Sequence, residues 1–163
     1  MDLNRFFITF GGTGLSPKAP GTVGSFAALI VGLLILQVVP METFFMITLA
    51  ITVVGIFEIN KYEAKTGSHD DKSIVIDEVS GMWITLLFAL STAQTLSYTY
   101  VYEIAVISSF ATFRLFDIWK PSTIGKIDRD VKGGLGVMGD DILAGAAAGL
   151  LTILLLLGLA KVL

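Results

Sequence analysis

Residues 140–163, DDILAGAAAGLLTILLLLGLAKVL, contain the clearest apolar segment of the chain, and an acidic pair stands directly before it. A helix needs about 20 residues to cross the hydrocarbon of a bilayer, and residues 142–163 meet that length. Four further apolar segments, of which the second is short, lie at 24–41, 42–58, 79–97 and 99–118. We therefore expect an all-α, multihelical, membrane-associated bundle of about five apolar helices in a single domain, 1–163.

The composition supports a membrane protein and excludes several classes of function. Hydrophobic residues make up 54% of the chain and the mean hydropathy is +0.81, which exceeds the average for soluble domains. A net charge of −3 argues against nucleic acid as a partner. The absence of cysteine removes disulfides, thiolate metal sites and a cysteine nucleophile. A soluble bundle whose core helices imitate membrane spans is the alternative.

The charged residues gather in three polar stretches, 1–25, 58–78 and 114–141. These stretches hold ten of the eleven Lys and Arg residues and twelve of the fourteen Asp and Glu residues. Threading the five segments across a bilayer places all three stretches on one face, which the positive-inside rule assigns to the cytoplasm. Residues 1–20 lack the apolar core and cleavage site of a signal peptide, so none is expected.

A glycine-rich stretch, GGTGLSPKAPGTVGS at residues 11–25, precedes the first apolar segment. Its five Gly and two Pro predict an irregular loop rather than a helix, with Ser25 as N-cap of the first span. Free backbone N–H groups at such a helix start suit an anion, although the P-loop pattern is absent. The candidate phosphate-binding side chains are Thr13, Ser16, Lys18 and Thr22. The alternative is an ordinary turn at the membrane surface.

Two acidic pairs stand at the starts of apolar segments. Asp77 and Glu78 precede residues 79–96, and Asp140 and Asp141 open the last segment after a four-glycine loop. One such pair can simply complement a helix dipole, but adjacent carboxylates at a membrane boundary are costly unless they bind a cation or a base. His69, the only histidine, is a candidate for proton transfer.

Further charged residues lie in the last polar stretch. If the fourth segment is helical, Arg114 and Asp117 share a face at i, i+3 spacing and Lys120 continues that face, before Pro121 ends the helix. Asp128 and Arg129 precede the four-glycine loop. These residues form either structural ion pairs or a carboxylate site flanked by phosphate-binding cations. Oxygen ligands with a single histidine and no cysteine favour Mg²⁺ over zinc.

The motifs resemble those of bacterial phosphatidylglycerophosphatase A. The matching stretches are GTGLSP at 12–17, APGTVGS at 19–25, SIVIDE at 73–78, GMW at 81–83, FRLFD at 113–117, WKP at 119–121, DR at 128–129 and the region 133–145. The resemblance implies a Mg²⁺-dependent enzyme of phospholipid biosynthesis that removes the terminal phosphate of phosphatidylglycerophosphate. It also implies a multi-pass protein of the bacterial cytoplasmic (inner) membrane with its active site facing the cytoplasm.

Residues and resemblance together predict the roles of the polar side chains. The candidate catalytic residues are Asp77, Glu78, Asp117, Asp128, Asp140 and Asp141, and all of these except Asp128 are candidate metal ligands. Arg114, Lys120 and Arg129 are the candidate phosphate clamps. Water is the simplest nucleophile, and a phospho-aspartate intermediate is the alternative.

Two other classes of protein compete with the phosphatase prediction. An ion or metal transporter would use the carboxylates as permeation sites, but it would place them near the bilayer midplane, and the middles of all five segments lack charge. A structural membrane subunit leaves the polar clusters without a role. The sequence leaves the number of metal ions, the headgroup specificity and the oligomeric state open.

Overall fold

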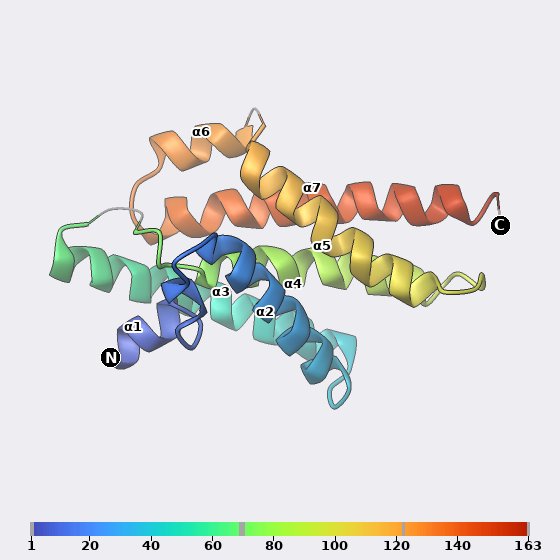
Figure 1. Ribbon diagram of the computed structural model, residues 1–163, viewed down its shortest axis with the longest axis horizontal. Coiled ribbons are helices and arrows are strands. Elements are labelled where there is room, and N and C mark those ends of the chain that lie inside the picture. The colour runs from blue at the N-terminus through green and yellow to red at the C-terminus, as the bar shows by residue number, and fades with distance from the viewer. Residues whose placement is uncertain (1, 69–70, 122, 163) are drawn as a thin grey trace.

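A computed structural model describes residues 2–68, 71–121 and 123–162. Every regular element in this part of the chain is helical (Figure 1). The elements are α1 (Leu3–Ile8), the short 3₁₀ helix η1 (Thr13–Leu15), α2 (Pro20–Leu36), α3 (Met41–Thr66), α4 (Ile76–Ala93), α5 (Val101–Trp119), α6 (Thr123–Asp130) and α7 (Gly134–Leu159). The expected all-α bundle is confirmed.

Helix α4 is the centre of the bundle. It packs against α2, α3, α5 and α7, and most of its 18 residues are buried. Its Trp83 is fully buried and satisfies the indole N–H by donating to the carbonyl oxygen of Ala28 on α2, at 2.7 Å. A helix this apolar is stable when neighbouring helices or membrane lipid cover its surface.

Three helices of the described chain are long and apolar enough to cross a membrane, namely α3, α4 and α7. Helix α2 is also apolar but has only 17 residues. Helix α5 has 19 residues but contains Glu103, Arg114 and Asp117, so three of the five expected spans reach that standard. The 26 residues of α3 extend about 39 Å, more than the roughly 30 Å of bilayer hydrocarbon. We expected this apolar segment to end at residue 58. The last two turns of α3 therefore lie in the polar stretch 58–78.

Glycines set the close approach of α4 and α7. A Cβ atom on Gly81 would lie 2.5 Å from the carbonyl oxygen of Asp141, and one on Gly145 would overlap the backbone of Gly81. The Thr85 hydroxyl lies 3.0 Å from the carbonyl oxygens of both Gly81 and Gly145. The spacing of Gly145 and Gly149 is typical of closely packed helices, and Gly149 lies against the ring of Phe88.

Two glycine-rich segments are more helical than their composition suggests. Helix α2 begins at Pro20 with Ala19 as its N-cap, so the prediction that Ser25 caps this helix is wrong. Helix α7 begins at Gly134, so Asp140 and Asp141 lie in its second turn rather than at its start. Glycine is required in these turns for contact, because a Cβ on Gly134 would overlap the backbone of α3 at Ile56.

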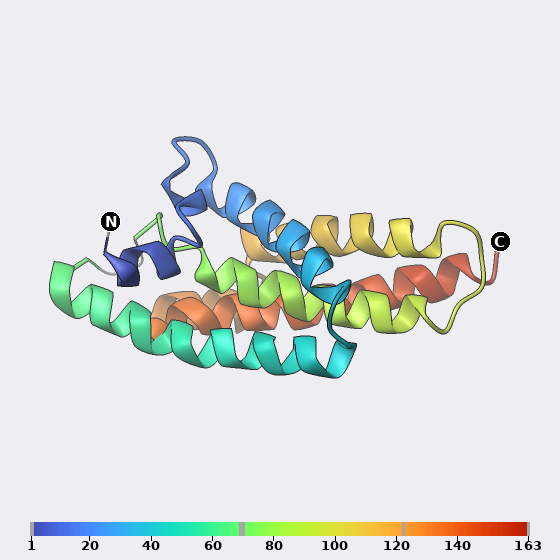
Figure 2. The same ribbon diagram turned by 90° about the horizontal axis from the view of Figure 1, so that it is seen from below.

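The charged stretches meet at one end of the bundle, as expected. The first turns of α2, α4 and α7 and the last turns of α3 and α5 lie at this end, together with α1 and α6 (Figures 1 and 2). The α4–α5 connection and the C-terminal end of α7 lie at the opposite end. We call the first end the polar end.

Candidate active site

Three carboxylates converge at the polar end. Asp77 and Glu78 lie in the first turn of α4, and Asp141 lies in the second turn of α7. One oxygen from each of the three side chains lies within 4.8 Å of the others. Asp141 is 2% exposed and Glu78 is 9% exposed. We call this group the carboxylate triad, and it joins two of the acidic motifs that the sequence had placed about 60 residues apart.

Each member of the triad has one oxygen that the described residues leave without a hydrogen bond. These atoms are Asp77 Oδ1, Glu78 Oε2 and Asp141 Oδ2, and all three are buried. A buried carboxylate oxygen without a partner is costly. Oxygen atoms from several carboxylates are the ligands that Mg²⁺ and Ca²⁺ prefer. These carboxylate oxygens, which lack hydrogen-bond partners among the described residues, therefore fit a divalent cation.

Arg114 joins α5 to α2 beside the triad. Its guanidinium forms an ion pair with Asp117, the expected i, i+3 pair on α5. It also donates from Nη1 to the hydroxyl of Ser25 at 3.1 Å and from Nη2 to the hydroxyl of Thr22 at 3.2 Å. These contacts use the planar fork of arginine to fix the orientation of the cation.

Lys120 supplies a second cation at the C-terminal end of α5. The helix ends at Trp119, as Pro121 predicted, and Lys120 caps it in the left-handed conformation with φ 43°, which is uncommon for a residue other than glycine. The chain turns sharply there, and Lys120 Nζ lies 2.5 Å from Asp140 Oδ2 on α7. Asp140 is 3% exposed. Asp117 and Asp140 thus each face a cation, and they flank the triad.

The start of α2 approaches the triad through backbone. A Cβ atom on Gly21 would overlap Glu78 Oε1 and would lie 3.5 Å from Arg114 Nη1. Any larger residue at this position would therefore displace the Glu78 carboxylate. Of the predicted phosphate-binding hydroxyls, Thr22 lies at this point.

The other predicted loop residues have local contacts. The Thr13 hydroxyl donates to the carbonyl oxygens of Thr9 and Phe10 at 3.2 and 3.0 Å. The Ser16 hydroxyl donates to the carbonyl oxygen of Lys18 at 2.9 Å, and the Lys18 side chain is exposed. These bonds shape the loop. The sequence alone could not distinguish hydroxyls with this local role from hydroxyls that bind a ligand.

The last predicted residues lie on or near α6. Arg129 is exposed in the last turn of this helix, which packs against α7. Neither α6 nor α1 was anticipated from the sequence. The predicted roles of His69 and of the Asp128 side chain lie outside the described residues and side chains.

Two polar residues that sequence analysis did not select hold the triad's helices in place. Asn60 on α3 accepts a hydrogen bond from the backbone N–H of Gly134 at 2.7 Å, which fixes the start of α7. Asp71 accepts from the backbone N–H and hydroxyl of Ser73, both at 2.9 Å, and from the hydroxyl of Tyr62 at 3.0 Å. The Ser73 amide holds the pKa of the Asp71 carboxyl below its usual value. The only sequence signal for Asn60 was its position as a polar residue just after an apolar segment.

Comparison with known proteins shows the family to which this chain belongs. The family model for phosphatidylglycerophosphatase A matches residues 6–156. The chain is 40% identical over 141 residues to phosphatidylglycerophosphatase A of Escherichia coli K12, covering 86% of this chain and 76% of the relative. It is 37% identical over 133 residues to the Haemophilus influenzae protein of that name, covering 82% and 76% of the two chains. The chain belongs to the phosphatidylglycerophosphatase A family.

A third relative has a different assignment. It is a Bacteroides thetaiotaomicron protein, provisionally named a phosphatidylinositol-3-phosphatase, and it is 39% identical over 138 residues, covering 82% of this chain and 81% of its own. All three names describe phosphatases that act on phospholipids. The Bacteroides name specifies a different headgroup from the other two. No solved structure matches the chain significantly.

Proposed function

We propose that this chain hydrolyses the terminal phosphomonoester of phosphatidylglycerophosphate, giving phosphatidylglycerol and phosphate, and that it requires Mg²⁺. The observation that carries this proposal is the carboxylate triad of a member of the phosphatidylglycerophosphatase A family. One oxygen from each of its side chains lies within 4.8 Å of the others, and each side chain has a buried oxygen without a hydrogen bond among the described residues. Asp77, Glu78 and Asp141 would hold the ion. Bound there, Mg²⁺ supplies positive charge and Lewis acidity to the reacting phosphoryl group.

The charge balance of the site supports a cation. When ionised, the triad with Asp117 and Asp140 carries five negative charges, against two positive charges from Arg114 and Lys120. Two like charges 4.8 Å apart repel by about 3.5 kcal/mol at an effective dielectric constant of about 20. A phosphomonoester brings nearly two further negative charges at neutral pH. A site with these residues needs added positive charge before it can receive that anion.

The chain's own cations are placed to orient the phosphoryl group. Thr22, Ser25 and Asp117 hold the Arg114 guanidinium at the edge of the triad, and Asp140 holds the Lys120 ammonium. Fixed cations stabilise the charge that spreads over the phosphoryl oxygens in the transition state. Hydrolysis breaks the bond between phosphorus and the glycerol oxygen, and we propose water rather than a carboxylate as the attacking group.

The headgroup of the substrate is tested by direct comparison. Purified protein in mixed micelles is offered phosphatidylglycerophosphate or phosphatidylinositol 3-phosphate with the same acyl chains, and released phosphate is measured. We expect kcat/KM to be at least about tenfold higher for phosphatidylglycerophosphate, a preference worth about 1.4 kcal/mol. A preference for the inositol lipid would transfer the proposal to the activity named for the Bacteroides relative, and no release from either lipid would reject it.

We also propose that the polar end faces the cytoplasm of the bacterial inner membrane, because it holds ten of the eleven basic residues. The chain has no cysteine, so single cysteines can report its orientation. Ser68 and Gln94 are exposed near opposite ends of the bundle. In intact spheroplasts, an impermeant thiol reagent should label Gln94→Cys and spare Ser68→Cys until the membrane is opened. The reverse pattern would contradict the orientation.

A further inference from the structure

An apolar groove of about 780 Å³ lies between α1, α2 and α3 near the polar end. Its walls include Phe6 and Phe7 of α1, Ala27 and Val31 of α2, and Ile51 and Val54 of α3. The volume falls within the range of pockets that bind small ligands, about 300–1,000 Å³. Val54 is 45% exposed and Phe6 is 51% exposed, so the groove opens to the surroundings of the bundle.

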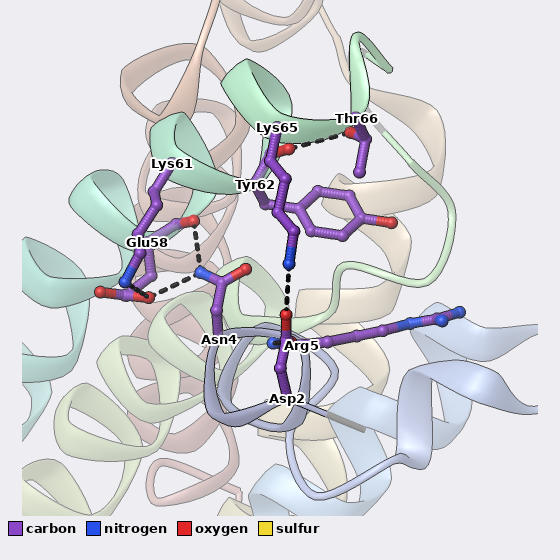
Figure 3. A network of polar contacts seen from close by, with 8 residues as sticks. All are labelled: Asp2, Asn4, Arg5, Glu58, Lys61, Tyr62, Lys65 and Thr66. Atoms are coloured by element: carbon purple, nitrogen blue, oxygen red, sulfur yellow. Dashed lines mark hydrogen bonds and ion pairs between the residues drawn. The ribbon is translucent and has the colours of Figure 1, made fainter.

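Polar contacts pin α1 beside the groove (Figure 3). Asn4 Nδ2 donates to the carbonyl oxygen of Glu58 at 2.9 Å and to its Oε2 at 2.6 Å. Lys65 Nζ lies 2.7 Å from Asp2 Oδ2. These contacts attach one side of α1 to the last turns of α3, while the aromatic side chains of α1 line the groove. Asn4, Glu58 and Lys61 also give the groove a polar rim.

The groove begins beside the carboxylate triad. Ile76 lines the groove, and the next residue, Asp77, belongs to the triad. Thr13 lines the groove as well, and the same loop continues to Gly21, whose backbone lies against Glu78. Helix α2 likewise contributes to both features, since Thr22 contacts Arg114 and Ala27, five residues later, lines the groove.

We propose that this groove binds an acyl chain of the phospholipid substrate while its phosphate reaches the triad. The proposal rests on the proposed function and adds a binding site to it. An apolar wall with a polar rim at one edge matches a lipid, whose chain is apolar and whose head is polar. The helix that carries Val54 is also a candidate membrane span, so the medium outside the groove supplies lipid chains.

A second apolar groove, of about 870 Å³, lies among α3, α4 and α7. It is lined by Ser91, Thr92 and Thr95 at the C-terminal end of α4, whereas the triad lies in the first turn of that helix and near the start of α7. A substrate chain in this second groove would lie at the wrong end of the bundle for its phosphate.

The groove is tested by filling it. Val54→Trp places a large side chain in the groove, and Val53→Trp is the matched control, because Val53 is the adjacent residue, is also 45% exposed and does not line the groove. Phosphate release is measured from dioleoyl and from water-soluble dihexanoyl phosphatidylglycerophosphate. We expect Val54→Trp to lower kcat/KM at least tenfold for the long-chain lipid and less than twofold for the short-chain lipid. Val53→Trp should change neither by more than twofold. Equal effects of Val54→Trp on both lipids, or no effect, would overturn the proposal.

A binding measurement separates this proposal from the proposed function. Wild-type protein is placed in phosphatidylglycerol vesicles that contain a lipid with a photoreactive group in its acyl chain, and labelled peptides are identified by mass spectrometry. We expect labelling concentrated on the groove walls and reduced at least fivefold by Val54→Trp but not by Val53→Trp. This labelling experiment remains informative even if the protein hydrolyses neither phosphatidylglycerophosphate nor phosphatidylinositol 3-phosphate. Even labelling of all exposed helices would overturn the proposal, as would an unlabelled groove that chemical cross-linking shows to be covered by a second copy.

Discussion

Asp141→Asn is expected to lower phosphate release from phosphatidylglycerophosphate at least about 100-fold, the scale of losing a strong electrostatic contact to the transition state. The substitution keeps the size of the side chain but removes its charge. The sequence left open whether Asp141 merely caps a helix, and Asn would serve as well in that role. The structure places Asp141 in the second turn of α7, whose N-cap is Gly133, so loss of a cap cannot explain a defect.

The control for this variant is Asp130→Asn, which makes the same chemical change on the exposed end of α6. It should retain activity within about twofold. Both variants should melt within a few degrees of the wild type in circular dichroism, which separates loss of chemistry from loss of fold. Turnover like that of the wild type in Asp141→Asn, with unchanged Mg²⁺ dependence, would remove Asp141 from the site.

Arg114→Lys is expected to lower kcat/KM about 100-fold, although the positive charge is kept. A lysine ammonium is a single point donor and cannot reproduce the fork that contacts Thr22, Ser25 and Asp117 together. The cation would lose its fixed orientation, and stabilisation of the transition state depends on donors that are already in place.

Arg5→Lys on the exposed face of α1 is the matched control, and it should change kcat/KM by less than twofold. If Arg114→Lys also changed kcat/KM by less than twofold, Arg114 would contribute charge alone, and the argument from its geometry would fail.

Local patterns in the sequence predicted much of the fold and part of the site. Apolar length identified the main helices, and i, i+3 spacing predicted the pair of Arg114 and Asp117, because both signals lie within one helix. The acidic motifs identified all three members of the triad. Their convergence depends on the α4–α7 contact, and that contact is set by glycines such as Gly81 and Gly145.

The errors arose where tertiary contacts override composition. Glycine lowers helix propensity, so the starts of α2 and α7 were predicted as loops. In the structure both segments are helical. Gly21 and Gly134 lie against neighbouring groups that leave no space for a Cβ atom, so tertiary contact rather than helix propensity requires glycine there. Asn60 was missed for a related reason, since its partner is a backbone amide 74 residues away.

The most direct test of a cation-dependent phosphatase site is a chelation experiment on purified wild-type protein. Phosphate release from phosphatidylglycerophosphate is measured in mixed micelles, then in excess EDTA, and then after Mg²⁺ is restored above the chelator. We expect a loss of at least about 100-fold in EDTA and full recovery with Mg²⁺, because the carboxylate triad without added positive charge would repel the substrate phosphate. Undiminished phosphate release in excess EDTA would contradict a cation-dependent site.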